Sequence, residues 1–472
     1  MATNPELLLE TAARLRRENG QGLHDRLTEA IYTEAATLAD RAVSRTGQSR
    51  RVRFDLALDR VLTSRLWGFP VMLLMLTAVL WLTVAGANVP SAMLSSLLQG
   101  TVYDALHGAA RAVGAPWWLS GFLIDGVYLA TAWVVSVMLP PMAIFFPLWT
   151  LLEDFGYLPR VAFNLDRLFK RAGAHGLQSL TMMMGYGCNA AGVVSTRIID
   201  SPRERLIAIV TNNFSVCNGR WPTLILVGAI FIGATAPPAL ASFIAASSVV
   251  AVAILGVVFT LLVSAFLSRT WLKGESSSFS LELPPYRPPQ IWQTLYTSLI
   301  DRTLIVLKRA VVMAAPAGAV IWLISNVSFG GASVADHLIQ FLNPFGGLLG
   351  LNGVILLAYV VAIPANEIVV PTILMLTLNG ARSSLAQTGV MIELEDAQVQ
   401  QVLMGLGGWT FLTGMNLMLF SLLHNPCSTT ILTIWRETRS LKWTSVATFL
   451  PVALGIAVCL ITATAARLLG LV

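Results

Sequence analysis

Long apolar stretches constrain the fold of this chain more than any other feature of its sequence. Runs such as Trp67–Gly86 and residues 240–267 carry no charged side chain, and about 20 apolar residues suffice for a helix to cross a ~30 Å hydrocarbon core. Charged residues make up only 12% of the 472 residues, against roughly 25% in an ordinary soluble protein. The sequence therefore predicts an all-α polytopic membrane protein in contact with lipid.

The distribution of Lys and Arg predicts how the chain is divided and oriented. Residues 1–66 are expected to form a soluble helical head, whose part from Arg41 to Arg65 holds seven arginines, and residues 67–470 the transmembrane transport domain. Because basic residues stay on the cytoplasmic side of a bacterial inner membrane, we expect a cytoplasmic N-terminus. The net charge of +6 then reflects cytoplasmic segments and not a nucleic-acid partner. The basic residues expected outside or within the membrane are Arg111, Arg382, Arg467 and Arg220.

Four clusters of polar or helix-breaking residues interrupt the apolar segments. They are Gly185–Gly192, Asn212–Pro222, Pro364–Glu367 and His424–Cys427. The first lies within Leu177–Ile199, which basic residues flank at both ends, so we expect a re-entrant hairpin with Gly185 and Gly187 at its turn. Irregular backbone at membrane depth is tolerated only where it is buried in protein or lines a wet cavity.

These breaks divide the transport domain into two gate repeats, at about 122–232 and 311–436. Each repeat is expected to contain an interfacial helix, a re-entrant hairpin and a broken transmembrane helix, with the second repeat inverted relative to the first. Folds of this kind hold their substrate near the bilayer midplane, between the discontinuous helices. We also expect a helix break near Pro140–Pro141 and a separate interfacial helix over Ile291–Leu307.

The side chains at the breaks indicate a site for a borderline divalent metal. Cys188 and Cys217 offer thiolates, Asn189 an amide oxygen, and Glu367 a carboxylate in the second hairpin. Thiolates bind such metals well, and an uncompensated acid at membrane depth is unfavourable by at least about 2.5 kcal/mol, so it usually serves an ion path or pairs with a base. Cys427 is the next candidate. Each cysteine taken alone has the alternative of being a small, buried apolar residue.

Further polar residues at the breaks are secondary candidates for the same path. Glu367 has the alternative of a structural ion pair with the basic residue at comparable depth, Arg220. His424 has i, i+3 spacing to Cys427, and the alternative place for this pair is the cytoplasmic exit. The secondary candidates are Asn218, Arg220, Asn366 and His424.

At these residues the chain resembles the membrane part of the bacterial ferrous iron transport protein B family. Gly185-Tyr186-Gly187-Cys188-Asn189 matches the family's gate motif, and Cys217 falls on its second gate cysteine. Ala365-Asn366-Glu367 and Asn425-Pro426-Cys427 are similar to its later motifs. The resemblance implies Fe(II) import with the gate cysteines as metal contacts. Ala190-Ala191-Gly192 departs from the family's Val-Pro-Ala, which leaves the choice among Fe, Mn and Zn open.

The resemblance also implies a GTP-binding domain, which usually precedes the membrane part in this family. The sequence contains no Gly-x-x-x-x-Gly-Lys-Ser/Thr phosphate loop. We therefore expect no GTP site in this chain, no permanently bound cofactor, and a separate small GTP-binding protein at the head. A homo-oligomer is compatible with the sequence.

Together these features predict a transporter and not an enzyme, since neither a His-Glu-x-x-His nor a Gly-x-Ser-x-Gly motif occurs. The expected function is inward transport of Fe(II), or a similar divalent transition metal, across the inner membrane. One alternative is a nucleoside-type organic solute transporter, because re-entrant gate hairpins also resemble those of concentrative nucleoside carriers. The other is a membrane scaffold for a separate GTPase.

Overall fold

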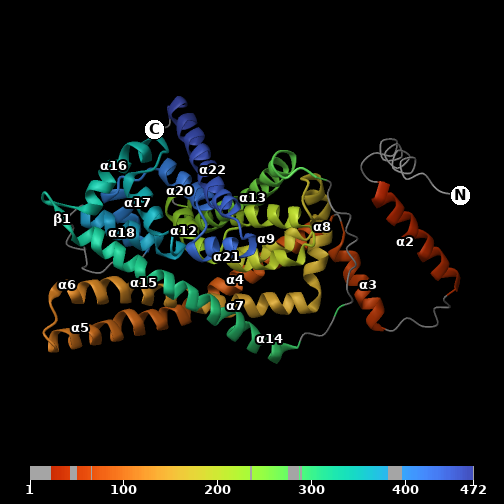
Figure 1. The fold of residues 1–472 in the computed structure, drawn as a ribbon, viewed down its shortest axis with the longest axis horizontal. Helices are drawn as coiled ribbons and strands as arrows, with labels where there is room; N and C mark the ends of the chain where they lie inside the picture. Colours follow the sequence, from red (N-terminus) through yellow and green to blue (C-terminus); the bar gives the residue numbers. More distant parts are fainter. Residues whose placement is uncertain are drawn as a thin grey trace, which may run out of the picture.

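The computed structural model shows an almost entirely helical chain (Figure 1), and it describes residues 23–42, 50–64, 66–233, 237–274, 286, 290–380 and 396–470. Within these ranges seven helices are long and apolar enough to cross a membrane. They span Gly68–Ala112, Trp117–Phe155, Pro202–Ile232, Phe243–Arg269, Ile291–Asn326, Phe411–Thr438 and Leu441–Leu468. In the same ranges, strands β1 (Ser328–Phe329) and β2 (Ala332–Ser333) form one antiparallel pair. The predicted all-α polytopic membrane fold is confirmed.

Three long helical rods pack together and form the scaffold of the molecule. They place the α5–α6 turn and β1 at one end of the long axis and the head at the other (Figure 1). The second and third rods approach so closely that a Cβ on Gly318 would lie 2.3 Å from the Gly126 carbonyl oxygen, and small residues permit such contacts between membrane helices. The rods comprise α4 (Gly68–Ser95), η1 (Ser96–Val102) and α5 (Tyr103–Ala112); α6 (Trp117–Ser120), η2 (Gly121–Tyr128) and α7 (Leu129–Phe155); and α14 (Ile291–Thr297), η8 (Ser298–Leu304) and α15 (Ile305–Asn326).

The helix break expected near Pro140–Pro141 is wrong. Both prolines lie inside α7, which continues to Phe155. Proline removes a backbone donor, but membrane helices tolerate it where neighbouring helices and local adjustments satisfy the exposed carbonyls. α7 packs against α4 and α15, so its neighbours supply that support.

The separate interfacial helix expected over Ile291–Leu307 is also wrong. The segment continues through the π-helical η8 into α15 as one 36-residue helix. Polar contacts hold its first part against α7: the hydroxyl of Thr294 donates to Asp154 at 2.7 Å, and that of Ser298 donates to Thr150 at 3.2 Å. These buried polar contacts, and not an amphipathic stripe, fix its direction.

Two sets of shorter elements pack against the scaffold in the same order. The first set comprises α8 (Tyr157–Arg171), α9 (Gln178–Gly187), α10 (Asn189–Ser195), η3 (Thr196–Ile198), α11 (Pro202–Thr211), η4 (Asn212–Phe214), η5 (Asn218–Arg220), α12 (Trp221–Val227) and η6 (Gly228–Ile232). The second comprises α16 (Val334–Leu348), α17 (Gly353–Val361), η9 (Asn366–Ile368), α18 (Val369–Gly380), α19 (Asp396–Gln401), η10 (Val402–Leu406), α20 (Phe411–Leu423) and α21 (Ser428–Thr438). The sets are followed by α13 (Pro238–Arg269) and α22 (Leu441–Leu468). In each set one helix (α8 or α16) and a pair of short helices around a break (α9 and α10, or α17 and α18) precede a broken helix. The inverted orientation of the second set in a membrane stays a prediction.

The described part of the head consists of α2 (Leu23–Ala42) and α3 (Arg50–Leu62), while residues 1–22, 43–49 and 65 of the predicted head lie outside the described residues. α3 is attached to α8 through Asp59. The Arg160 Nε donates to Asp59 Oδ1 at 2.9 Å, and the Tyr286 hydroxyl donates to the same oxygen at 2.7 Å. The buried Arg160 guanidinium also lies 4.1 Å from the centre of the Tyr286 ring.

This junction determines the charge of Asp59. Burial alone would raise the pKa of its carboxyl, but hydrogen bonds from Arg160 and Tyr286 and the positive charge of Arg160 outweigh burial and hold the pKa below its ordinary value of 3.8. Because the pKa of Asp59 is lower in the folded protein, the ionised carboxylate stabilises the junction fully at pH values above 3.8. The contribution is lost as the pH falls through the lowered pKa.

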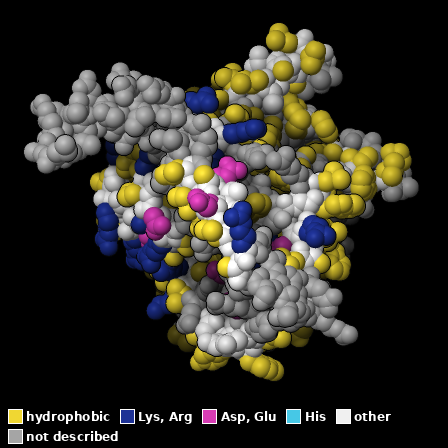
Figure 2. All heavy atoms as spheres, turned by 90° about the vertical axis from the view of Figure 1, so that its right-hand side faces the viewer, with side chains coloured by type: hydrophobic (Ala, Val, Ile, Leu, Met, Phe, Trp, Pro, Cys, Tyr) yellow, Lys and Arg dark blue, Asp and Glu magenta, His cyan; other side chains and the backbone are white. Residues whose placement is uncertain are grey.

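Basic side chains gather at the head end of the molecule. Figure 2, which views this end, shows Lys and Arg side chains clustered there with fewer acidic ones. Such an excess is typical of the cytoplasmic side of a bacterial membrane protein. The clustering agrees with the predicted cytoplasmic N-terminus, which remains a prediction because no membrane is present.

We expect Arg160→Met to weaken the attachment of α3 to α8. The change leaves Asp59, which is 27% exposed, without its cationic partner and removes the donor to the Gly156 carbonyl. The free energy of unfolding should fall by about 1–3 kcal/mol, below the range for fully buried pairs, and a lower Tm of the purified protein would report it. Lys170→Met, which removes a half-buried i, i+4 pair on the same helix, is the matched control and should change the Tm little. Equal shifts in both variants would contradict the assigned role.

Candidate metal pathway at four helix breaks

Four helix breaks meet in the interior, at the four clusters that the sequence predicted. Break one is Cys188, between α9 and α10. Break two is residues 212–220, between α11 and α12. Break three is residues 362–365, between α17 and η9, and break four is residues 424–427, between α20 and α21. Each break leaves backbone amides and carbonyls without partners in their own helix.

The backbone follows the same path at corresponding breaks of the two sets. Cys188 has φ −152° and ψ 120°, and Ala365 has φ −151° and ψ 117°; each is followed directly by an asparagine. Cys217 (φ −77°, ψ 166°) and Cys427 (φ −64°, ψ 158°) likewise each precede a new helical segment. This correspondence supports the view that the two sets are related repeats.

Glycines allow the first hairpin, α9 and α10, to pack closely on its neighbours. A Cβ on Gly187 would lie 1.9 Å from Cε1 of Phe145 on α7, and a Cβ on Gly185 would lie 2.9 Å from the Asn212 side-chain oxygen. The predicted turn glycines therefore act by removing bulk, with break one held between α7 and break two. Asn212 completes this contact, because its amide nitrogen donates to the Asn189 carbonyl at 2.9 Å.

Arg220 joins break two to break four. Its guanidinium is buried and donates to the Asn213 carbonyl and side-chain oxygens, both at 2.9 Å, and to the Leu422 carbonyl at 3.0 Å. Asn213 in turn donates to the His424 carbonyl at 2.8 Å. The described hydrogen bonds of Arg220 all end on carbonyl and amide oxygens. The ion pair with Glu367 that the sequence left as an alternative is not among the described salt bridges.

Glu367 instead lies against break two. A Cβ on Gly219 would be 2.2 Å from its Oε1, so the carboxylate packs directly on backbone that follows Cys217. The segment η9, which holds Glu367, packs against η5, which directly follows Cys217. Both Glu367 and Asn218 are half-buried, so these polar groups face incompletely filled space.

The three candidate thiols lie in one region of the interior. Cys188 directly precedes α10, which packs against α21, and Cys427 directly precedes α21. Cys217 lies in break two, where Asn213 donates to the His424 carbonyl of break four. Cys188 and Cys427 are half-buried, and Cys217 is buried. Within the described residues, no three His, Cys, Asp or Glu side chains are close enough to hold a metal ion together. The thiols and Glu367 thus offer metal-binding chemistry around a shared region without forming a closed site in this conformation.

His424 is held by other residues at break four. Its Nδ1 lies 2.8 Å from the Ser421 carbonyl oxygen and its Nε2 lies 3.2 Å from the Asn366 side-chain oxygen. Its ring also packs on Tyr359, with the ring centres 4.8 Å apart. His424 and Asn366 therefore join break four to break three.

One buried acidic residue was missed by the sequence analysis. Asp125 lies in η2, and both the Tyr103 hydroxyl and His107 Nε2 contact its Oδ1, the latter at 2.8 Å. The sequence signal was available, since Asp125 is the one acidic residue between Asp104 and Glu153. The cluster belongs to the scaffold rods and not to the breaks.

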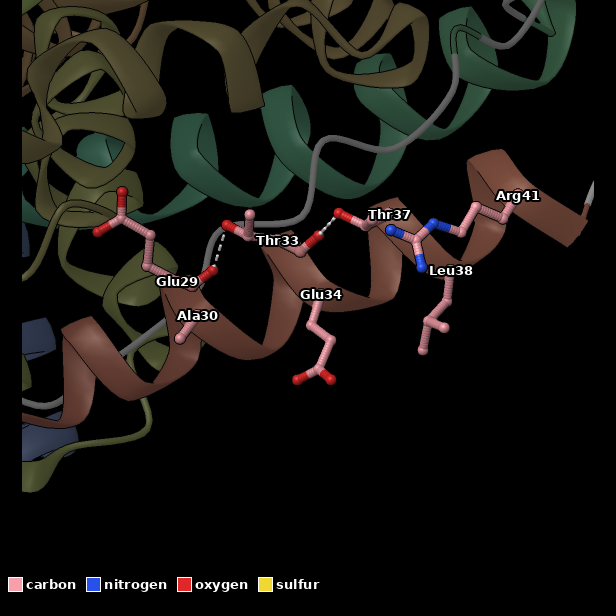
Figure 3. Close-up of a pocket in the computed structure, with 7 residues that line it drawn as sticks. All are labelled: Glu29, Ala30, Thr33, Glu34, Thr37, Leu38 and Arg41. Atoms are coloured by element: carbon pink, nitrogen blue, oxygen red, sulfur yellow. Dashed lines mark hydrogen bonds between the residues drawn. The ribbon is translucent and has the colours of Figure 1, made fainter.

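A surface hollow on the head is unrelated to the breaks. It is lined by Glu29, Ala30, Thr33, Glu34, Thr37, Leu38 and Arg41, which all belong to α2 (Figure 3). The Thr33 and Thr37 hydroxyls donate back to carbonyls one turn earlier, so they serve their own helix. Such a hollow along a single helix has no second wall to enclose a small ligand.

We expect Gly187→Ala to displace the first hairpin from α7, because the new methyl group would overlap the Phe145 ring. Overpacking typically destabilises a core by about 1–3 kcal/mol, which a lower Tm should reveal. Gly347→Ala is the matched control, since nothing lies within 4 Å of the added Cβ in α16. An unchanged Tm for Gly187→Ala would show that the hairpin is not packed in this way.

Two family models match parts of the chain. A family model described as "Nucleoside recognition" (Gate) matches residues 135–231 and 307–441, and one described as "Ferrous iron transport protein B C terminus" matches residues 249–301. No solved structure matches the chain at a significant level.

Curated relatives carry one printed name, Fe(2+) transporter FeoB. The protein from Staphylococcus aureus (strain MSSA476) is 28% identical over 407 residues, which cover 84% of this chain and 57% of the relative. That from Synechocystis is 26% identical, covering 84% and 60%, and that from Salmonella typhimurium is 30% identical, covering 70% and 40%. The matched part of the chain therefore spans between 40% and 60% of the length of these relatives.

Proposed function

Because the chain belongs to the ferrous iron transport protein B family and matches the membrane portion of its members, we propose that it carries Fe(II), or a similar divalent transition metal, inward across the bacterial inner membrane. The proposed path runs between the two gate repeats, near the bilayer midplane. Its first contacts are Cys188, Cys217, Asn189 and Glu367, followed by Cys427. Fe(II) is here the cargo and not a resident cofactor.

The observation that carries this proposal is the meeting of three thiols and one carboxylate at breaks from both repeats. Soft thiolates and a carboxylate suit a borderline divalent metal. An ion that is to be released must be bound weakly or at several successive sites. The open arrangement of these groups fits such a stepwise path better than a permanent metal centre.

A nucleoside-type solute is the competing cargo. The description of the matching gate model names nucleoside recognition, and a nucleoside site would use the amides at the breaks in place of the thiols. The two cargoes differ in the side chains that they require, so they can be separated by substituting the cysteines.

We further propose that a separate small GTP-binding protein docks on the head, at α2. The described side chains of α2 are exposed, including the apolar Leu27, Ile31 and Leu38 on one stripe. An apolar stripe with charged residues on the other faces is typical of a helix that packs against a partner. The junction of α3 with α8 at Asp59 would then connect the docked partner to the first hairpin, which follows α8 in the chain.

Cys188→Ser combined with Cys217→Ser should reduce Fe(II) uptake at least tenfold, because hydroxyls replace the softer sulfur ligands. The measurement is uptake into liposomes that contain the purified protein, with Fe(II), Mn(II), Zn(II) and a nucleoside compared side by side. Cys459→Ser, a cysteine in α22 away from the breaks, is the matched control. Undiminished metal uptake in the doubly substituted protein, or uptake of the nucleoside but of no metal by the unsubstituted protein, would reject the metal path.

Leu27→Glu combined with Leu38→Glu should abolish capture of a GTP-binding protein, because the charges cover the apolar stripe of α2. Co-purification from the native host, followed by assay for bound GTPase activity, provides the measurement. Thr33→Glu with Thr37→Glu introduces the same charge at other positions of α2 and serves as the control. Recovery of no GTPase with the unsubstituted protein would sink this proposal while leaving metal transport untouched.

A further inference from the structure

Two buried oxygens between hairpin one and break two have no hydrogen-bond partner. They are Asn212 Oδ1 and Ser215 Oγ, in residues that are 2% and 1% exposed. They lie 2.9 Å and 3.0 Å from the point that a Cβ on Gly185 would occupy, so they converge beside that glycine. Buried polar atoms without partners are rare, and each one needs a physical explanation.

The side-chain amide of Asn189 also lies among oxygen atoms. One of its two terminal atoms lies 3.0 Å from the Gly185 carbonyl oxygen and 3.2 Å from that of Ser215; the other lies 3.2 Å from Asn213 Oδ1. The orientation of Asn213 is fixed, because Arg220 donates to its oxygen. All three neighbours of the Asn189 amide are therefore acceptors. In one orientation of this amide its nitrogen donates to the Gly185 and Ser215 carbonyls and its oxygen faces that of Asn213; in the other its nitrogen donates to Asn213 Oδ1 and its oxygen faces both carbonyls.

From this convergence we propose a sodium site between hairpin one and break two. Its ligands are the Gly185 and Ser215 carbonyls with the side-chain oxygens of Asn189, Asn212 and Ser215. Unwound backbone carbonyls at helix breaks are suited to bind such cations in transporters. Oxygens 3.0–3.2 Å apart are spaced as neighbouring ligands of one small ion.

The chemistry of the ligands favours a single positive charge. None of the five oxygens belongs to a carboxylate, so a divalent ion would be left poorly compensated in a buried place. The Arg220 guanidinium beyond Asn213 repels a dication twice as strongly as a monocation. Asn189 is the one residue shared with the proposed metal path, and a thiol-free, all-oxygen set is otherwise unlike the thiols assigned to the transported metal.

Bound sodium would fix the two cysteine-bearing breaks relative to each other. The ligands come from hairpin one, which carries Cys188, and from break two, which carries Cys217. Sodium occupancy thereby sets the geometry of the metal path, a consequence that rests on the proposed transport function. The site itself does not depend on that function and is tested without iron.

The test is thermal unfolding of the purified full chain in detergent, followed by tryptophan fluorescence at constant ionic strength. The Tm should rise with NaCl concentration as expected for a ligand that binds only the folded state, and should not rise when choline replaces sodium. Ser215→Ala should raise the NaCl concentration required for half of the effect about tenfold, since it removes one ligand. Ser179→Ala removes another buried hydroxyl, on α9, which donates to the Gly176 carbonyl, and should leave the sodium response unchanged.

Asn212→Asp is expected to strengthen sodium binding. It is the variant to use if Ser215→Ala does not fold. The new carboxylate keeps the unpartnered oxygen and adds a negative charge, so half of the effect should occur at a lower NaCl concentration. Identical Tm values in sodium and choline for the unsubstituted protein would overturn the proposal and indicate that water fills the space. An equal response to potassium would overturn the assignment to sodium.

Discussion

The Arg220 guanidinium, buried between two helix breaks, is the contact on which the interior of this protein depends. A helix that ends inside a membrane protein leaves carbonyl groups that lipid cannot satisfy. Arg220 donates to Leu422, at the end of α20, and to Asn213 in break two. One side chain from the first set of elements thus stabilises the interrupted helix of the second set. Because the Arg220 guanidinium donates to carbonyl oxygens and not to Glu367, the Glu367 carboxylate stays beside Gly219 and the thiols.

Close packing of the hairpin helices stabilises the helix breaks that Arg220 connects. The hairpin helices have only 7 and 10 residues, and isolated helices of that length are marginal in water even with favourable sequences. Their stability must come from tertiary contacts, which Gly187 and Gly185 make available against α7 and break two. The same principle fixes the scaffold at Gly126 and Gly318. At these positions glycine contributes by lacking a side chain, which leaves room for close packing, more than by adopting unusual backbone angles.

Sequence reasoning located the breaks but not all of their contacts. Polar and helix-breaking residues within apolar runs identified all four, because local chemistry alone makes a continuous membrane helix unfavourable there. The same reasoning failed at Pro140–Pro141, since the neighbours of α7 compensate for the lost donors. It also left open whether Glu367 pairs with Arg220, and it passed over Asp125. These outcomes depend on residues distant in the chain, such as Leu422 for Arg220 and His107 for Asp125.

The sequence by itself determined that this protein lies in a lipid bilayer, and it determined the positions at which its helices end. Long uncharged runs require a bilayer, and Cys188, Cys217 and Cys427 stand at interruptions that any helical arrangement would keep. Only the tertiary structure decided which interruptions face one another and which groups satisfy them. The reason is that an unpaired carbonyl or amide can be satisfied by many partners, and the choice is made by packing between segments up to two hundred residues apart. The unpartnered oxygens of Asn212 and Ser215 likewise become visible only once hairpin one lies against break two.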